Sequence, residues 1–489
     1  MESNELSEKH GNRRHGPVLN FPNKFFWGSA TAAFQIEGHP EEYLAKLSDW
    51  SEWIDREDKV LRPTNDGMAV NHYEHMHEDI ELIRGMNNNS YRFSFNWARI
   101  HRGPGEFDEN ALQFYESLLD KLDQKNKRVE DRKTPIEPFA TLVHFVLPNW
   151  LAKAGGWENE NTAREFEQFT KKILEKFGNR IKYWVTHNEP NIFLGFGYES
   201  GIWPPGKEND WAGYMQAYQG LLLGHQLAYK AIKNYDSRNQ VGFAQNLYYF
   251  QAVKEEDLVP NIVRSQMHNY AFIESCKQMG CLDFLGVNYY TRFSYKLNSH
   301  AKDATRPDLS TSLWGELQDM EELYPGQIEK NNLGWEIYPE GLFRVLTEKR
   351  MKDLLDGIPV YITENGYCHI ENNESLDLTG SIKETQGKSD DDKVDPYRIK
   401  FIKSHLIAIH KAIQAGVDIK GYFYWSLLDN FEWALGMKPR FGLIHVDHQS
   451  FNRTPKSSYY YYAEIAKNNG LIGYNEESEH EKEPELRTI

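Results

Sequence analysis

Eight short apolar runs divide the chain, and segments with helical periodicity lie between them. The runs begin at Phe25, Ser90, Glu137, Lys182, Gln240, Asp283, Pro359 and Ile419. The helical segments cover residues 71–86, 109–124, 162–177, 211–235, 342–355 and 397–415. Strands that alternate with helices indicate a parallel sheet with helical crossovers. Eight such units in one uninterrupted chain predict a single (β/α)8 TIM barrel with long strand-to-helix loops.

An open, doubly wound sheet is the competing fold for this pattern. No G-x-G-x-x-G segment follows the first apolar run and the chain has no P-loop, which disfavours nucleotide-binding sheets of that class. The 489 residues are 40% hydrophobic, enough for a large core, and no linker divides them. We therefore expect one barrel domain over residues 18–470, between a disordered segment at residues 1–17 and an acidic flexible tail at residues 471–489.

The charge and the cysteines restrict the partners and the compartment. A net charge of −16 argues against nucleic acid and against an anionic membrane surface. The opening MESNELSEKHGNRRHG lacks the apolar region of a secretion signal, and no apolar stretch is long enough to span a bilayer. Cys276, Cys281 and Cys368 form no even disulfide framework, and the separation of the first two is not a usual zinc spacing. We expect free thiols in a cytoplasmic protein without metal or cofactor, whose oligomeric state stays open.

Polar and aromatic side chains collect at the ends of the apolar runs. They are Arg92, His144, Asn188, Glu189, Asn288, Tyr290, Glu364 and Trp425. The carboxyl ends of barrel strands form the active site in this fold, so these side chains are expected to converge. Taken singly, several of them also fit an ordinary structural role, since Glu364 precedes an Asn-Gly turn signal and could be solvated. Likewise His144 and Trp425 could be core residues, Arg92 a structural ion-pair partner and Asn288 a turn residue.

Two carboxylates in this set, Glu189 and Glu364, end the fourth and the seventh runs. We expect these runs to lie on opposite sides of the barrel, with both carboxylates facing one cleft. Glycoside hydrolysis needs such a pair, because a protonated carboxyl donates to the leaving oxygen while an ionised one attacks the anomeric carbon or activates water. Arg92 would help to keep one of them ionised, since a nearby cation lowers a carboxyl pKa.

The segments THNEP around Glu189 and YITENG around Glu364 resemble the two signatures of glycoside hydrolase family one, the β-glucosidase family. Further blocks resemble that family in the same order: FFWGSATAAFQIEG, YRFSFNWARI, TLVHFVLPNWL, DFLGVNYYT, GWEIYPEGL and WSLLDNFEWALGMKPRFGL. The resemblance covers residues 25–462 and implies a retaining β-glycosidase. The chain departs from the family pattern at His187, Phe145 and Asn96, and His187 could shift the pH optimum by acting on Glu189.

The resemblance implies a role for each matching residue. Glu189 would be the general acid/base and Glu364 the nucleophile, with carboxyl groups roughly 5–5.5 Å apart, as retention requires. Arg92 and Tyr290 would contact the nucleophile, and Asn188 would bind the sugar 2-hydroxyl. The other substrate-binding residues would be Gln35, His144, Glu432 and Trp433 at the hydroxyls, Trp425 under the ring, Trp335 on the aglycone side, and Asn288 and Tyr290.

The backbone around Asn188 and Glu189 poses a geometric problem, because neighbouring residues on a regular strand face opposite sides. We therefore expect the strand to end or distort at Asn188, through a bulge or a nearby non-proline cis peptide. Pro190 should hold Glu189 in an extended conformation. Glu432 and Trp433 raise the same problem, and we expect them on a loop.

The resemblance implies small-molecule substrates, namely terminal non-reducing β-D-glucosides and also galactosides or fucosides. One branch of the family cleaves 6-phosphoglycosides and has serine, lysine and tyrosine where this chain has Glu432, Pro439 and Phe441. Glu432 would repel a phosphate, although Lys438 and Arg440 nearby keep that substrate open. A transglycosidase and a catalytically inactive glycan-binding barrel are further alternatives. The long polar segments at residues 297–333 and 367–395 are expected to select the aglycone.

Overall fold

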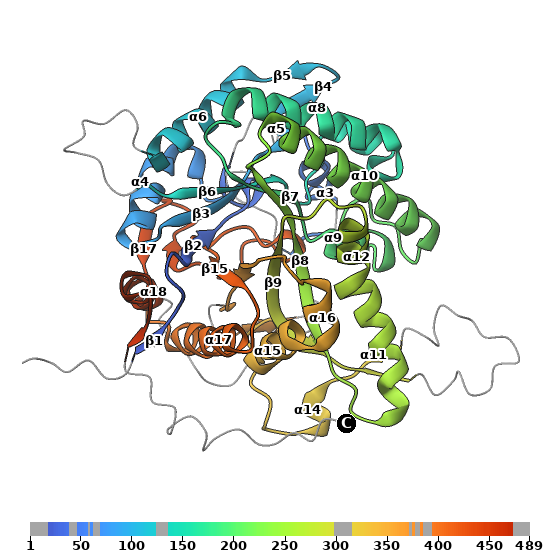
Figure 1. The fold of residues 1–489 in the computed structure, drawn as a ribbon, viewed down its shortest axis with the longest axis vertical. Helices are drawn as coiled ribbons and strands as arrows, with labels where there is room; N and C mark the ends of the chain where they lie inside the picture. The colour runs from blue at the N-terminus through green and yellow to red at the C-terminus, as the bar shows by residue number, and fades with distance from the viewer. Residues whose placement is uncertain are drawn as a thin grey trace, which may run out of the picture.

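The computed structural model describes residues 18–38, 46–56, 59–61, 69–123, 135–297, 315–370, 374–376, 382–384 and 394–472. Its centre is a closed barrel of eight parallel strands, and helices surround it (Figure 1). The barrel strands are β2 (Phe26–Ala30), β3 (Ser90–Ser94), β6 (Glu137–Val143), β7 (Tyr183–Asn188), β8 (Gln240–Phe250), β9 (Phe284–Phe293), β12 (Val360–Asn365) and β15 (Ile419–Trp425). The (β/α)8 barrel predicted from the alternation of runs is therefore confirmed.

The main helices connect successive barrel strands or follow the last one, and the periodic segments predict all of them except those at residues 258–265, 271–278 and 457–468. They are α4 (His72–Gly85), α6 (Glu109–Asp123), α8 (Glu160–Phe177), α10 (Trp211–Tyr235), α11 (Leu258–Ser265), α12 (Ala271–Gln278), α15 (Pro339–Thr347), α16 (Lys349–Leu354), α17 (Pro396–Gln414) and α18 (Ser457–Asn468). Periodicity predicts one helix over residues 342–355, but the structure breaks this segment into α15 and α16. Glu348 has extended backbone at the break, and its carboxylate accepts a hydrogen bond from the Tyr270 hydroxyl. Periodicity does not reveal such a distant contact.

Short elements fill the connections between the long ones. The short α-helices are α1 (Ala33–Ile36), α3 (Asp49–Trp53), α5 (Trp97–Ile100), α7 (Asn149–Lys153), α9 (Pro190–Leu194) and α14 (Met320–Leu323). Turns of 3₁₀ or π type are η2 (Gly156–Glu158), η3 (Gly195–Glu199), η4 (Glu255–Asp257), η5 (Gln266–Tyr270) and η8 (Trp433–Leu435). Antiparallel pairs are β1 (Val18–Asn20) with β18 (Gly470–Ile472), β4 (His101–Gly103) with β5 (Glu106–Phe107), β10 (Tyr295–Lys296) with β11 (Glu316–Leu317), β13 (Glu374–Leu376) with β14 (Ile382–Glu384), and β16 (Ile444–Val446) with β17 (Arg453–Pro455).

Aromatic rings fill the barrel interior near the amino-terminal ends of its strands. Phe139 stacks on Tyr183 at a centroid distance of 4.3 Å, and it contacts Phe423 at 4.7 Å and Tyr361 at 5.2 Å. Gly28 makes room for this layer, since a Cβ there would lie 2.4 Å from the Phe423 ring. The amino-terminal part of the barrel is therefore packed, and polar side chains are left to the carboxyl ends.

The two ends of the described chain meet in the small sheet of β1 and β18, where Val18 pairs with Ile472. Leu471 and Ile472 belong to this strand, although the sequence pattern places them in the tail. The expectations for residues 1–17 and 473–489 lie outside the described residues. Among the helices that the structure describes, none is long and apolar enough to cross a membrane.

Candidate active site

Glu364 lies at the carboxyl end of β12 and is buried, so the alternative of a solvated turn residue is wrong. Nη1 of Arg92 donates to its Oε1 at 2.6 Å, and the Tyr290 hydroxyl donates to its Oε2 at 2.7 Å. Position 366, two residues after Glu364, requires glycine, because a Cβ there would lie 1.8 Å from the carbonyl oxygen of Trp425. The glycine of the ENG sequence thus allows the ends of β12 and β15 to lie close together, and the sequence does not mark an exposed turn.

Glu189 follows the last residue of β7 and is also buried. Nδ2 of Asn288 donates to its Oε1 at 2.7 Å, and Nδ2 of Asn246 donates to the same oxygen at 3.0 Å. Both partners are neutral amides, whereas Glu364 has a cation as its partner. The two carboxyl groups therefore have different surroundings.

The extended conformation predicted for Glu189 is wrong, because its backbone is left-handed with φ 44° and ψ 61°. Its N–H donates to the carbonyl of Ala244 at 2.7 Å, while its own carbonyl accepts from Ile192 and Phe193 as α9 begins. Glu189 thus ends a strand and starts a helix at the same residue, with Pro190 in the first helical position, where a missing N–H costs nothing.

The predicted distortion at Asn188 is confirmed by a register shift between β7 and β8, which falls between Val185 and Asn188. The left-handed turn at Glu189 follows at once. Together they bring the side chains of Asn188 and Glu189 to one site. A non-proline cis peptide is present at Trp425–Ser426, not beside Asn188.

The expectation that the two carboxylate strands lie on opposite sides of the barrel is wrong. In the barrel order, β8 and β9 separate β7 from β12 on one side, and four strands do so on the other. Asn288 on β9 connects the two acids, because its side chain donates to Glu189 and its backbone is the register partner of Glu364. Asn288 is therefore a strand residue between the two carboxylates, not a turn residue.

The protonation of the two acids follows from their surroundings. Burial, followed by the charge of Glu364, raises the pKa of Glu189 to about 8. Burial also raises the pKa of Glu364, but the positive charge of Arg92 and the hydrogen bond from Tyr290 act to lower it. At neutral pH this arrangement favours a protonated Glu189 and an ionised Glu364.

Asn188 and His144 lie beside the two acids. Oδ1 of Asn188 accepts from Nη2 of Arg92 at 2.6 Å, and its Nδ2 donates to Nε2 of His144 at 3.1 Å. Nε2 of His144 is then an acceptor, so its proton sits on Nδ1, a buried atom without a partner among the described residues. Burial holds the pKa of His144 well below its ordinary value, so the ring is neutral. It offers one hydrogen-bond donor to a ligand.

Gln35 and Glu432 form a second polar group. Nε2 of Gln35 donates to the carbonyl of Phe431 at 2.7 Å and approaches Oε2 of Glu432 at 3.5 Å. Oε1 of Gln35 is buried and has no partner among the described residues. Burial, with the charges of Glu364 and Glu189, raises the pKa of Glu432 to about 8. Unpaired buried polar atoms are costly, and a hydroxyl-rich ligand would satisfy them.

Aromatic faces accompany these polar groups. The His144 ring lies nearly parallel to Trp425 at a centroid distance of 5.7 Å and to Trp433 at 6.0 Å. Trp433 opens η8 in the connection after β15, with Glu432 directly before it, so this pair lies on a loop that contains a short 3₁₀ turn. Trp335 is half-buried in the connection before α15, and its ring contacts Tyr290 at 5.5 Å.

Asn246 on β8 is a contact of Glu189 that the sequence does not reveal. Its signal is the polar pair Gln245 and Asn246 inside the run QVGFAQNLYYF, most of which is apolar. His187 is expected from the sequence to act on Glu189, but its ring lies against Trp157 at 5.1 Å and Phe166 at 5.0 Å. Burial holds its pKa well below the ordinary value, so His187 brings no charge to the site.

Known proteins of one family resemble this chain over most of its length. The family model described as Glycosyl hydrolase family 1 matches residues 18–276 and 249–471. The chain is 33% identical to a protein named Beta-glucosidase A of Thermotoga maritima, over 93% of this chain and 99% of that protein. It is 29% identical to 6-phospho-beta-glucosidase GmuD of Bacillus subtilis, over 94% of this chain and 100% of that protein.

A solved structure is similar over the same length. The beta-glucosidase from Thermotoga maritima in complex with azafagomine aligns with a TM-score of 0.78 at 32% identity, covering 93% of this chain and all of that one. The match in fold and in sequence extends over both halves of the barrel. This chain therefore belongs to glycosyl hydrolase family 1, and it is a glycoside hydrolase.

Proposed function

We propose that this enzyme is a retaining β-glycosidase that hydrolyses terminal non-reducing β-D-glucosides, and also galactosides or fucosides, through a covalent glycosyl-enzyme. The observation that carries this proposal is the unequal environment of the two acids. Glu364 is bonded to a cation and a hydroxyl, whereas Glu189 is bonded to two neutral amides. Retention uses one acid as the nucleophile and the other as the proton donor.

In the first step, an ionised Glu364 attacks the anomeric carbon and the bond from that carbon to the aglycone oxygen breaks. Glu189 transfers its proton to that oxygen, so the aglycone leaves as an alcohol. In the second step, the ionised Glu189 removes a proton from water as the water attacks the same carbon. As the water attacks, the bond between that carbon and the Glu364 oxygen breaks, so Glu364 leaves as a carboxylate and Glu189 is protonated again.

The remaining site residues would bind the sugar. Oε1 of Gln35 and Nδ1 of His144 are unpaired among the described residues, and Glu432 is held by Gln35, which supports contacts with hydroxyl groups. The proposed substrate-binding set is Gln35, His144, Asn188, Asn288, Tyr290, Trp335, Trp425, Glu432 and Trp433, with Arg92 and Tyr290 supporting the nucleophile. Trp425 would lie under the sugar ring, where an aromatic face stacks on its apolar side. The half-buried Trp335 suits the aglycone side.

A panel of p-nitrophenyl β-glycosides tests this proposal. We expect the highest kcat/KM with β-glucoside, β-galactoside or β-fucoside, and retention of configuration in the first-formed sugar by proton NMR. Rapid hydrolysis of α-glucosides, or an inverted product, would contradict it. No hydrolysis at all, with glycan binding intact, would indicate a catalytically inactive barrel.

Hydrolysis of 6-phosphoglycosides is the second candidate, because Lys438 and Arg440 lie near Glu432 in sequence. Arg440 already has internal contacts, since its Nη1 donates to the carbonyl of Val446 at 3.1 Å and contacts Nε2 of His448 at 2.6 Å. These contacts favour the unphosphorylated sugar. A p-nitrophenyl β-glucoside 6-phosphate in the same panel decides between them, since a preference for the phosphate would refute the first assignment.

Three further proposals accompany the activity. Transfer to alcohols uses the same glycosyl-enzyme, so product analysis with and without added methanol measures the share of transglycosylation. The catalytic domain predicted over residues 18–470 would extend to Ile472, because β1 pairs with β18 as far as that residue. A cytoplasmic location is supported by three free buried cysteines, Cys276, Cys281 and Cys368.

A further inference from the structure

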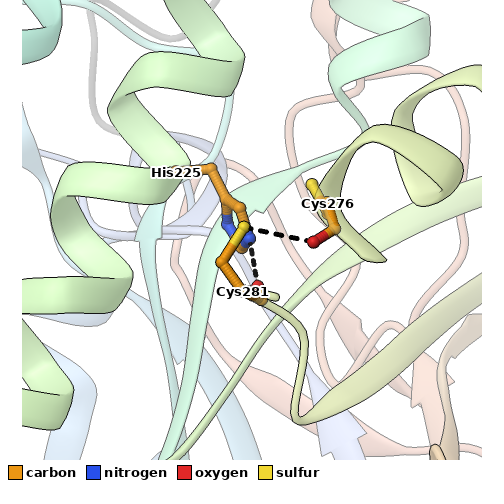
Figure 2. Close-up of side chains that lie close together, drawn as sticks. All are labelled: His225, Cys276 and Cys281. Carbon is orange, nitrogen blue, oxygen red and sulfur yellow. Dashed lines mark hydrogen bonds between the residues drawn. The ribbon is translucent and has the colours of Figure 1, made fainter. Parts of the chain in front are cut away.

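Cys276 and Cys281 lie together at the carboxyl end of α12, facing His225 on α10 (Figure 2). The end of α12 is a Schellman turn. The N–H of Gly280, which has a positive φ of 64°, donates to the carbonyl of Lys277 at 3.0 Å, and the N–H of Cys281 donates to that of Cys276 at 3.1 Å. This turn brings the side chains at its two ends into contact. The separation of the two cysteines in the sequence does not indicate a metal site, but the turn brings their free thiols close together.

The three side chains offer one imidazole nitrogen and two sulfur atoms. These donor atoms all lie within 4.8 Å of one another, and all three residues are buried. Thiolates and imidazole are the ligands that soft and borderline cations prefer. We propose that His225, Cys276 and Cys281 form a binding site for a single thiophilic divalent cation, such as Zn²⁺ or Cd²⁺, distinct from the glycosidase site.

The hydrogen bonds of His225 are compatible with this role. Its Nε2 donates to the carbonyl of Cys281 at 2.6 Å, and its Nδ1 lies 2.7 Å from Oγ1 of Thr186. The Thr186 hydroxyl also approaches the carbonyl of Gly242 at 3.3 Å. It can therefore accept from Nδ1 and donate to Gly242, which lets Nε2 give up its hydrogen and coordinate a cation. The bond from Nε2 to the Cys281 carbonyl is the contact that the cation replaces.

The location gives the site a structural consequence. His225 belongs to α10, the two cysteines to the end of α12, and Thr186 to β7, the strand that ends beside Glu189. A cation here would join two outer helices next to a barrel strand. Because it would bind the folded chain through a geometry that unfolding destroys, the thermal midpoint should rise as the free cation concentration exceeds the dissociation constant.

The test uses the full, reduced protein after removal of metals by a chelator. Titration with Co²⁺ is followed by thiolate-to-cobalt charge-transfer absorption, and titration with Cd²⁺ by equilibrium dialysis. We expect one equivalent per chain, and an affinity at least about tenfold lower for Cys281→Ser and His225→Ala. Cys368→Ser is the matched control, because it removes a buried free thiol elsewhere and should leave binding unchanged.

Three outcomes would overturn the proposal. The first is a wild-type protein whose Co²⁺ spectrum has no thiolate band, a result that does not depend on whether any variant folds. The second is undiminished Cd²⁺ binding by Cys281→Ser. Loss of binding in Cys368→Ser alone would place the cation at a different thiol and would also refute this site.

Discussion

Nη1 of Arg92 lies 2.6 Å from Oε1 of Glu364, and both side chains are buried. The side-chain partners of Glu189 are instead the amides of Asn246 and Asn288. A cation stabilises the ionised form of its neighbour, whereas burial among neutral groups stabilises the protonated form. The proposed division of two chemically identical side chains into a nucleophile and an acid rests on this difference in surroundings.

Replacing the proposed nucleophile tests the first half of this division. Glu364→Ala should lower kcat/KM for p-nitrophenyl β-glucoside by roughly 10⁴-fold or more, because no covalent ester can form. Azide should restore turnover by entering the vacated space and attacking the anomeric carbon directly. The product would be the α-glycosyl azide, identified by NMR. Wild-type activity, or a β-azide product, would refute the role of Glu364.

Replacing the proposed acid should give the opposite stereochemistry. Glu189→Ala should lower kcat/KM severely for alkyl glucosides but little for 2,4-dinitrophenyl glucoside, because that leaving group departs without a proton. Azide should then attack the glycosyl-enzyme and yield the β-azide. The two variants control for each other, and an exchange of their azide products would exchange the two roles.

The barrel is predictable from the sequence because its signal is repeated. Each barrel strand begins at or directly after the start of a predicted run, and the polar residue at the run's end is where a barrel places its chemistry. Arg92, Glu189 and Glu364 are found in this way, and the contact of Arg92 with Glu364 agrees with the expectation. At these positions the local sequence pattern and the fold both predict a side chain at the carboxyl end of a barrel strand.

The rest depends on contacts between distant segments. The left-handed backbone of Glu189 is stabilised by a hydrogen bond from its N–H to the carbonyl of Ala244 on a neighbouring strand. The conformational preference of a residue before proline does not include this contact. In the sequence, Asn246 lies within a largely apolar run, and its contact with Glu189 becomes evident only from the pairing of β8 with β7. The meeting of Cys276 with His225 likewise needs two helices in place.

Asn246 should tune the acid without carrying out chemistry. Its hydrogen bond favours the ionised form of Glu189, so Asn246→Ala should raise the Glu189 pKa further. The basic limb of the kcat/KM profile should then move to higher pH, and kcat should fall roughly tenfold where Glu189 must act as a base. The control is 2,4-dinitrophenyl glucoside, whose release needs no acid. An unchanged basic limb would show that Asn246 is only a packing residue.

Glu189 should also lower the stability of the protein as the pH rises. Its pKa is about 8 in the folded state against 4.5 ordinarily, so between these values the folded chain holds a proton that the unfolded chain has lost. Raising the pH through this window therefore favours unfolding. The side chain in Glu189→Gln cannot ionise. The free energy of unfolding of this variant, relative to that of the wild type, should therefore rise by ~3 kcal/mol between pH 4.5 and pH 7.

Denaturant unfolding of both proteins across this pH range measures the difference, and activity assays confirm that the variant has lost its acid. Glu175→Gln removes a carboxylate from the exposed surface of α8 and is the matched control for the loss of one carboxylate from the chain. If the difference in free energy of unfolding between Glu189→Gln and the wild type did not change with pH, Glu189 would ionise equally in the folded and unfolded states. The proton needed for the first catalytic step would then have to come from another group, because an acid that is already ionised at neutral pH cannot donate it.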